Sequence, residues 1–123
     1  TINDYQLFCN FLLNGKNKRG STIISKTMHD FMLTNRIPYQ LLPLRLGPIA
    51  LSGYGWNLIG RVMINKGLAM SLTEDGEFGW SGAASTYYWI DRKNQLTGII
   101  MTQYIGGYLT LSDDFRAASY TMI

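Results

Sequence analysis

The chain has 123 residues, of which 46% are hydrophobic and 15% charged, with a net charge of +3. This length fits one domain with a real core, and the composition excludes a disordered chain. Its basic residues are scattered except for Lys16, Lys18 and Arg19, and its apolar runs are too short for a membrane span, so we expect neither nucleic acid nor a membrane as a partner. Cys9 is the only cysteine, which excludes an intrachain disulfide and a cysteine-rich metal site, and no motif indicates a metal or a cofactor.

The N-terminal residues carry the pattern of an amphipathic helix. Thr1 followed by Asp4 resembles a capping box, and Gly15 is a typical residue after a helix end. Apolar side chains recur between them at helical spacing: Tyr5, Phe8, Cys9, Leu12 and Leu13. The pattern predicts a helix over about Ile2–Leu13, with Cys9 on its buried stripe as a small hydrophobe.

A second helix is predicted after a polar turn. Ser25 is a suitable N-cap for a helix that ends near Asn35. Its apolar face consists of Met28, Phe31 and Met32. His29 lies in this helix without a second histidine, so we expect an exposed helical residue rather than a ligand or a catalytic group. Three prolines then forbid a long regular element, and Arg36–Gly53 is predicted to be a loop.

The next segments predict one strand and one loop. Gly53–Met63 is rich in aromatic and β-branched residues, which favours a strand, and its glycines do not match the dinucleotide-binding fingerprint. Asn65–Gly76 is predicted to be a loop. Glu74, Asp75 and Glu77 cluster at its end, and we interpret them as a solvated turn rather than as paired catalytic acids.

The most informative stretch predicts a hairpin preceded by another strand. Ser85–Ile90 and Gln95–Thr102 are apolar, β-rich runs that flank the polar tetrad Asp91–Asn94, as expected for a hairpin with a four-residue loop. A short strand is expected within Phe78–Ala84. That segment contains two glycines, and glycine inside a strand marks a place where another backbone or a ligand comes close.

The C-terminal residues predict a last helix. Gly106-Gly107 breaks the chain after the hairpin, and Ser112 followed by two acids is a typical helix start. One face of this helix consists of Phe115, Ala118, Ser119 and Met122. Together the elements predict an α+β fold in a single domain, residues 1–123. We expect an antiparallel sheet of three to four strands packed with helices, two at the start and one at the end.

No complete catalytic motif stands in this chain. Gly79-Trp80-Ser81-Gly82-Ala83 approaches the Gly-x-Ser-x-Gly nucleophile elbow, but its last residue is alanine and a strand is expected to follow, not a helix. The one histidine also precedes the serine in the chain, in the reverse of the order in that fold. We therefore do not expect Ser81 to be a nucleophile.

Several short motifs taken together resemble a known family. They are Gly53-Tyr54-Gly55-Trp56, the stretch from Gly76 to Tyr87, Trp89-Ile90-Asp91 and Met101-Thr102-Gln103. This set is similar to the C-terminal part of the serine β-lactamase-like family, which includes class C β-lactamases, related esterases and penicillin-binding-protein-like hydrolases. The likeness runs from the helix that carries Phe8 to Asp114-Phe115-Arg116. It implies the C-terminal portion of a β-lactamase/transpeptidase-like fold.

The resemblance also implies a site. In the family, a Lys-Thr-Gly box, or its Trp-Gly-Gly variant in esterases, lies on a strand that forms one wall of the active site. The matching residues are Trp80, Ser81 and Gly82, and the backbone N–H of Ala83 corresponds to a donor of the oxyanion hole. Tyr54 is the further residue expected to bind substrate. Tryptophan in place of lysine favours an apolar ester or amide over a substrate whose carboxylate needs a cation.

Two family motifs are absent from this chain. No serine is followed by lysine at the third position, and no tyrosine begins Tyr-x-Asn. We therefore expect a processed product or an excerpt, the C-terminal segment of a serine hydrolase for a small ester, amide or β-lactam, which is inactive alone. The alternative is a non-catalytic binding or interaction module derived from that fold. The open strand edge of Gln95–Thr102 is expected to pair with the missing N-terminal segment or with a second copy.

Overall fold

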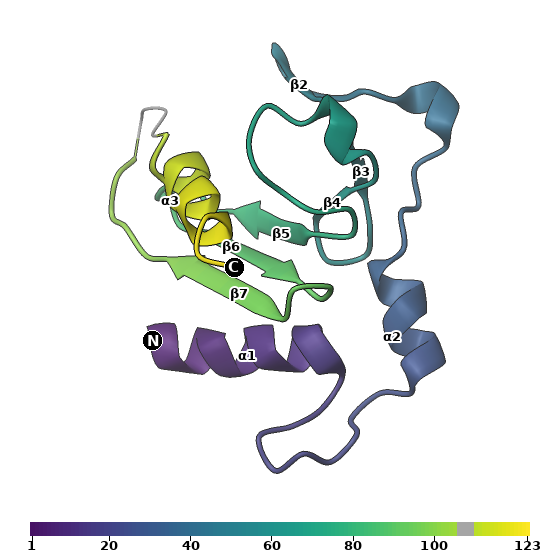
Figure 1. The fold of residues 1–123 in the computed structure, drawn as a ribbon, viewed down its shortest axis with the longest axis vertical. Coiled ribbons are helices and arrows are strands. Elements are labelled where there is room, and N and C mark those ends of the chain that lie inside the picture. The colour runs from purple at the N-terminus through teal and green to yellow at the C-terminus, as the bar shows by residue number, and fades with distance from the viewer. Residues whose placement is uncertain (106–109) are drawn as a thin grey trace.

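A five-stranded antiparallel sheet forms the centre of the molecule (Figure 1). The computed structural model describes residues 1–105 and 110–123. The strands of this sheet are β3 (Tyr54–Trp56), β4 (Arg61–Met63), β5 (Phe78–Ser81), β6 (Tyr87–Asp91) and β7 (Leu96–Ile100). They lie in this order, each paired with its neighbour in the chain, so the sheet is a meander. The predicted α+β class with an antiparallel sheet is confirmed.

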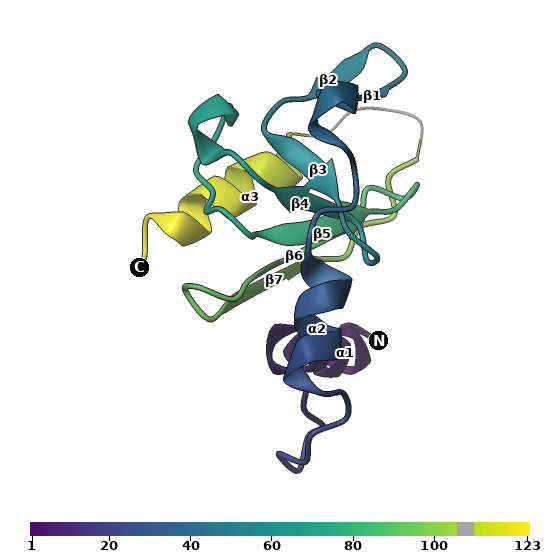
Figure 2. The ribbon, with the colours of Figure 1, turned by 90° about the vertical axis from the view of Figure 1, so that its right-hand side faces the viewer.

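Helices pack on both faces of the sheet (Figure 2). They are α1 (Ile2–Asn14), α2 (Lys26–Leu33) and α3 (Leu111–Tyr120). The Tyr5 ring of α1 meets Tyr88 edge-on with ring centroids 5.3 Å apart, and the Phe115 ring of α3 meets Trp89 edge-on at 5.5 Å. Tyr88 and Trp89 are consecutive residues of β6, so their side chains point to opposite faces. It follows that α1 and α3 cover opposite faces of the sheet.

The ends of the first two helices follow the predicted capping residues. The amide of Asp4 donates to Thr1 Oγ1 at 3.2 Å, and the backbone nitrogen of Thr1 donates to Asp4 Oδ2 at 3.2 Å, which completes the capping box. Gly15 ends α1 in the left-handed conformation with φ 73°. Ser25 caps α2 by accepting the amide of Met28 at 3.2 Å.

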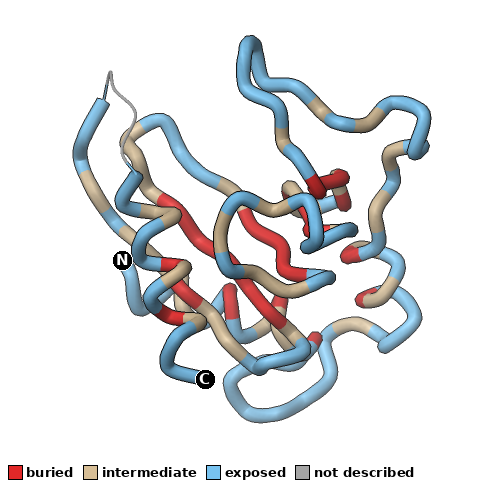
Figure 3. The backbone as a smooth tube through the Cα atoms, turned by 45° about the horizontal axis from the view of Figure 1, so that its top comes forward, coloured by how far each residue is buried: buried red, intermediate tan, exposed pale blue. Residues whose placement is uncertain are grey.

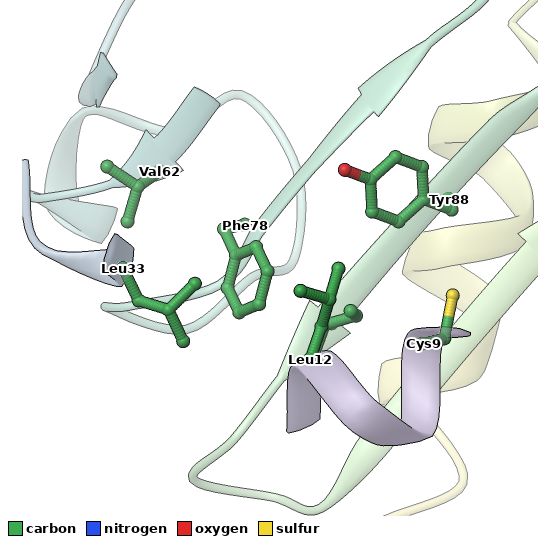
Figure 4. Close-up of a cluster of buried hydrophobic side chains, with 7 residues drawn as sticks. Cys9, Leu12, Leu33, Val62, Phe78 and Tyr88 are labelled. Carbon is green, nitrogen blue, oxygen red and sulfur yellow. The ribbon is translucent and has the colours of Figure 1, made fainter. Parts of the chain in front are cut away.

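The core lies between α1, α2 and one face of the sheet (Figures 3 and 4). Its buried members are Cys9, Leu12, Leu33, Val62, Phe78, Tyr88 and Ile90. Cys9 lies on the buried stripe, as predicted. Burial raises the pKa of its thiol to about 11, because the thiolate would lose its hydration there.

His29 is buried, so the expected exposed position is wrong. Its Nε2 lies 2.7 Å from the carbonyl oxygen of Leu12, and only 3% of the residue is accessible. A carbonyl oxygen only accepts, so Nε2 must carry the proton in this contact. The imidazole thus satisfies a carbonyl near the C-terminal end of α1 and ties α2 to α1.

The segment Gly53–Met63 forms two strands rather than the one predicted. The backbone N–H of Asn57 donates to the carbonyl of Gly60 at 2.9 Å. The side-chain Oδ1 of Asn57 accepts from the backbone N–H groups of Ile59 and Gly60 at 2.8 and 2.9 Å. This closes a tight turn between β3 and β4 and adds a strand, so the sheet has five strands instead of three or four. The turn lies inside an apolar run, which concealed it in the sequence.

The predicted loop Arg36–Gly53 holds only short elements. Strands β1 (Leu44–Leu46) and β2 (Ile49–Leu51) form a separate two-stranded hairpin, and Tyr39–Leu41 makes one 3₁₀ turn. Another 3₁₀ turn, Lys66–Leu68, lies in the predicted loop before β5. The exclusion of a long regular element by the prolines therefore holds.

Of the face predicted for the last helix, Ser119 is buried, whereas Phe115, Ala118 and Met122 are exposed. Arg116 and Ser119 are its buried residues, whereas Phe115 and Met122 are 45% and 79% exposed. Its N-cap is Thr110, not Ser112. The predicted break at Gly106-Gly107 lies outside the described residues. Across residues 1–105 and 110–123, none of the helices combines the length and apolar character that crossing a membrane requires.

Candidate functional site

The residues matched to the active-site box lie at the end of β5 and in the turn that follows. Trp80 and Ser81 are the last residues of β5, opposite Tyr88 and Tyr87 of β6. Gly82 and Ala83 begin the turn that joins the two strands. The structure therefore places the four matched residues in one continuous stretch at one end of the sheet.

The two glycines of this segment stand where a side chain would collide. A Cβ on Gly79 would lie 2.0 Å from the carbonyl oxygen of Tyr88, and a Cβ on Gly82 would lie 2.4 Å from Thr86 Oγ1. Both distances are far below van der Waals contact. The expected close approach of another backbone is confirmed at Gly79, and at Gly82 the neighbour is a side chain of the same turn.

A hollow of about 200 Å³ opens beside this segment. It is lined by Tyr5, Trp80, Ser81, Gly82, Thr86, Tyr87, Tyr88, Ile99 and Met101. None of these side chains is charged at neutral pH, and most are aromatic or aliphatic. Trp80 is half-buried rather than sealed in the interior, and its ring meets Trp56 edge-on at 4.5 Å between centroids. The hollow is therefore an apolar recess with a few hydroxyl and backbone groups at its border.

In the turn after β5, the amides of Ala83, Ala84 and Thr86 have no hydrogen-bond partner among the described residues, and Ala83 is the exposed residue of the three. The amide of Gly82 donates to the carbonyl of Thr86 at 2.8 Å, and the amide of Ser85 donates to the carbonyl of Gly82 at 3.1 Å. Within the part of the chain that the structure describes, the amide of Ala83 has no hydrogen-bond partner, and the residue is exposed. Ala83 follows Gly82, which lines the recess, and an exposed N–H in this position can donate a hydrogen bond to an anionic or polarised oxygen.

Tyr54 lies elsewhere. It belongs to β3, is buried, and its hydroxyl donates to Glu77 Oε2 at 3.3 Å and accepts from the guanidinium of Arg116. It borders a second hollow, of about 390 Å³, with residues that flank the β1–β2 hairpin and residues that follow β4. The structure thus brings Trp80, Ser81 and Gly82 together and separates Tyr54 from them.

Glu77, Arg61 and Arg116 form a buried ionic cluster beside the start of β5, which the sequence did not predict. Glu77 is completely buried, so its expected place in a solvated turn is wrong. Its Oε2 accepts from Arg116 Nη1 at 3.0 Å and from the Thr73 hydroxyl at 2.9 Å, and Arg61 Nη2 lies 3.9 Å from its Oε1. Burial works against the charge of Arg116, but Tyr54 and Glu77 outweigh it and raise the pKa of the guanidinium.

The alternation of side chains along β5 could have revealed that Glu77 faces the interior. Glu77 is two residues before Gly79, which pairs with Trp89, so continued alternation places Glu77 on the face that α3 covers. The described residues contain no group of three or more His, Cys, Asp or Glu that could hold a metal ion. The residues that line the recess offer backbone donors, hydroxyl groups and apolar surface.

The comparisons with known proteins support the fold. No family model and no curated protein matches the sequence. A solved structure, "EstCE1, a hydrolase with promiscuous acyltransferase activity", is similar, with a TM-score of 0.75 and 18% sequence identity. The similarity covers 95% of this chain and 29% of that one. The chain therefore has the fold of a segment of that hydrolase and spans less than a third of its length.

Proposed function

We propose that this chain is the C-terminal segment of a β-lactamase-like serine hydrolase that cleaves or transfers the acyl group of a small ester or amide. The observation that carries the proposal is the free, exposed amide of Ala83, the residue that follows Gly82 at the border of the apolar recess. The fold it shares with a segment of a hydrolase is consistent with this role.

The proposed role of Ala83 is to stabilise the oxyanion. A serine hydroxyl, supplied by the remainder of the enzyme, forms a bond to the carbonyl carbon while its proton passes to a base. The electron pair of the C=O bond moves to the oxygen, and the intermediate collapses by breaking the bond to the alcohol or amine, which takes the proton. A backbone N–H fixed beside that oxygen typically contributes about 10²–10³ in kcat.

The lining of the recess favours an uncharged substrate. Tryptophan occupies the place of the family's lysine, and no cationic side chain lines the hollow. A carboxylate placed there would lose hydration without gaining a partner, whereas an aromatic or aliphatic group would gain burial. We therefore place apolar esters and amides ahead of β-lactams that carry a carboxylate.

The chain alone is expected to be inactive, and a partner is expected at β7. The Ser-x-x-Lys and Tyr-x-Asn motifs are absent, and loss of the nucleophile and base costs several orders of magnitude. Among the described residues, β7 is the last strand in the sheet order, so one of its edges has no strand paired with it. Another strand could pair along that edge. We propose that the segment carrying the nucleophile, or a second copy of this chain, pairs there.

A titration with phenyl acetate tests the proposed site. The chain should not hydrolyse this neutral aryl ester, so binding can be followed by two-dimensional NMR. Amide shifts should change at Trp80, Gly82, Thr86 and Met101, and Trp80→Ala should abolish them. Rapid, saturable turnover by the wild-type chain, or shift changes confined to another surface, would contradict the proposal.

The alternative function is a non-catalytic binding module, favoured by the same absence of a nucleophile. In that case the recess binds a small apolar molecule that is never converted. Adding the segment that carries Ser-x-x-Lys separates the two functions. Restored ester hydrolysis supports the hydrolase, whereas binding without hydrolysis in the assembled protein supports the module.

A further inference from the structure

Two peptide groups of the turn after β5 are connected in series by hydrogen bonds. The N–H of Ser85 donates to the carbonyl of Gly82 at 3.1 Å. The peptide group that carries this N–H has the carbonyl of Ala84 at its other end. That carbonyl accepts two bonds, from Thr102 Oγ1 at 2.5 Å and from the amide of Tyr104 at 3.2 Å.

The free amide of Ala83 is the open end of this series. It belongs to the same peptide group as the carbonyl of Gly82, and no cis peptide bond occurs in the turn. In a trans peptide the C=O and N–H point in opposite directions, so directing the Gly82 carbonyl at Ser85 directs the Ala83 N–H away from the turn. The orientation of this donor is therefore set by the group that holds Ser85.

Ser85 is held from the segment after β7. Its φ is 59°, a conformation that residues other than glycine seldom adopt. Its hydroxyl donates to the carbonyl of Tyr104 at 2.9 Å, next to the bond that Tyr104 makes to Ala84. Thr102 and Tyr104 thus fasten the turn from outside, and Thr102 is the member of this pair that acts through a side chain.

A series of hydrogen bonds also changes the strength of its last donor. Each bond polarises the peptide group that it ends on, so the next bond becomes stronger, by about 10–30% per bond in condensed phase. The series runs from the Thr102 hydroxyl through Ala84 and Ser85 to Gly82 and Ala83. Removing the hydroxyl at one end therefore weakens and loosens the N–H at the other end.

We propose that Thr102 is a positioning residue for the Ala83 N–H. Its hydroxyl orients and polarises that donor through the two intervening peptide groups. The consequence for acyl transfer rests on the proposed function, because only there does the Ala83 N–H meet a developing oxyanion. The geometric part, the effect of Thr102 on the amide of Ala83, stands on the hydrogen bonds of this chain alone.

The test compares three variants of the whole chain by two-dimensional ¹H–¹⁵N NMR. Thr102→Val keeps the shape and removes the hydroxyl, and Thr102→Ser keeps the hydroxyl. Thr97→Val is the matched control. Thr97 lies on β7, just before Thr102 in the chain, and its hydroxyl accepts a hydrogen bond from Gln6 instead of bonding to the turn after β5. The readouts are the amide proton shift of Ala83, the exchange protection of Ser85, and the affinity for phenylphosphonate as an anionic mimic of the oxyanion.

Thr102→Val should move the Ala83 proton upfield, reduce the protection of Ser85, and weaken phenylphosphonate binding about twofold to tenfold, the range expected for one hydrogen bond. Thr102→Ser should match the wild type in all three readouts, and Thr97→Val should leave Ala83 unchanged. If Thr102→Val leaves Ala83 and Ser85 unchanged, or if Thr97→Val alters them equally, the positioning role is refuted. If Thr102→Val does not fold, a changed Ala83 shift in Thr102→Ser refutes it instead.

The same spectra separate this proposal from the proposed function. Wild-type chain that does not bind phenylphosphonate at Ala83 would count against the oxyanion hole. The response of the Ala83 shift to Thr102→Val would still decide the positioning role, because it is measured without any ligand.

Discussion

Removal of the carboxylate charge at Glu77 is expected to destabilise the chain more than any change at a surface acid. Glu77 is completely buried and lies between two guanidinium groups, Arg116 at 3.0 Å and Arg61 at 3.9 Å. The side chain of Arg116 is 5% exposed and that of Arg61 13%. Glu77→Gln preserves the shape but leaves the poorly solvated Arg61 without this counter-charge, and it leaves Arg116 paired with the partly exposed Asp113 at 3.4 Å.

Breaking a buried ion pair by neutralising one partner costs about 3–5 kcal/mol. A domain of this size has a free energy of unfolding of about 5–15 kcal/mol, so the change removes a large share of it. With a urea dependence of about 1–3 kcal/mol per molar, the unfolding midpoint should fall by at least 1 M, as a rough lower bound. Equilibrium urea unfolding followed by circular dichroism measures this shift.

Two further variants make the reasoning refutable. Asp30→Asn is the control, because this carboxylate pairs with Lys26 and Arg92 in an exposed setting and should change the midpoint far less. The double variant Glu77→Leu with Arg116→Leu should be less destabilised than the sum of its single variants, since neither member of this pair is then left without the other. The loss at Arg61 is the same in Glu77→Leu and in the double variant. A Glu77→Gln midpoint equal to that of Asp30→Asn would show that the cluster is solvated or that Glu77 is not its counter-charge.

Three other outcomes follow from buried positions. The Cys9 thiol should react with a thiol reagent only after unfolding. Because burial raises its pKa to about 11, this thiol ionises at a lower pH in the unfolded chain than in the folded one. The free energy of unfolding should therefore fall as the pH rises from about 9 to about 11. His29→Leu leaves the carbonyl of Leu12 without its partner, and urea unfolding should show a loss of about 1–3 kcal/mol; an unchanged midpoint would mean that water replaces the imidazole. Gly98→Ala places a Cβ 2.0 Å from the Trp89 ring, so it should cost about 1–3 kcal/mol and alter tryptophan fluorescence, whereas unchanged fluorescence would refute this packing.

The local pattern of the sequence predicts the elements whose signals are local. The capping residues Thr1 and Ser25 and the polar tetrad Asp91–Asn94 each stand within a few residues of the element they delimit, and the structure has those elements. The turn at Asn57 was missed because apolar residues surround it on both sides. Side-chain hydrogen bonds, not composition, make that turn.

Buried polar residues were the main failure of the sequence analysis. His29 is buried because a carbonyl of α1 needs its proton, and Glu77 is buried because Arg116 of the last helix pairs with it on the face of the sheet that this helix covers. Both partners are remote in sequence from the residue they satisfy, so periodicity does not reveal them. The position of Trp80, Ser81 and Gly82 beside one recess could be predicted only from the family resemblance, and the separate place of Tyr54 could not.

The meander order of the sheet also bears on how the chain folds. Every strand finds its partner across a connection to the next strand in the chain, so little loop entropy is lost before the ladder begins to form. Low sequence separation between contacts is associated with fast folding. The central sheet can therefore nucleate from its own hairpins, and the two terminal helices then dock onto opposite sides of β6.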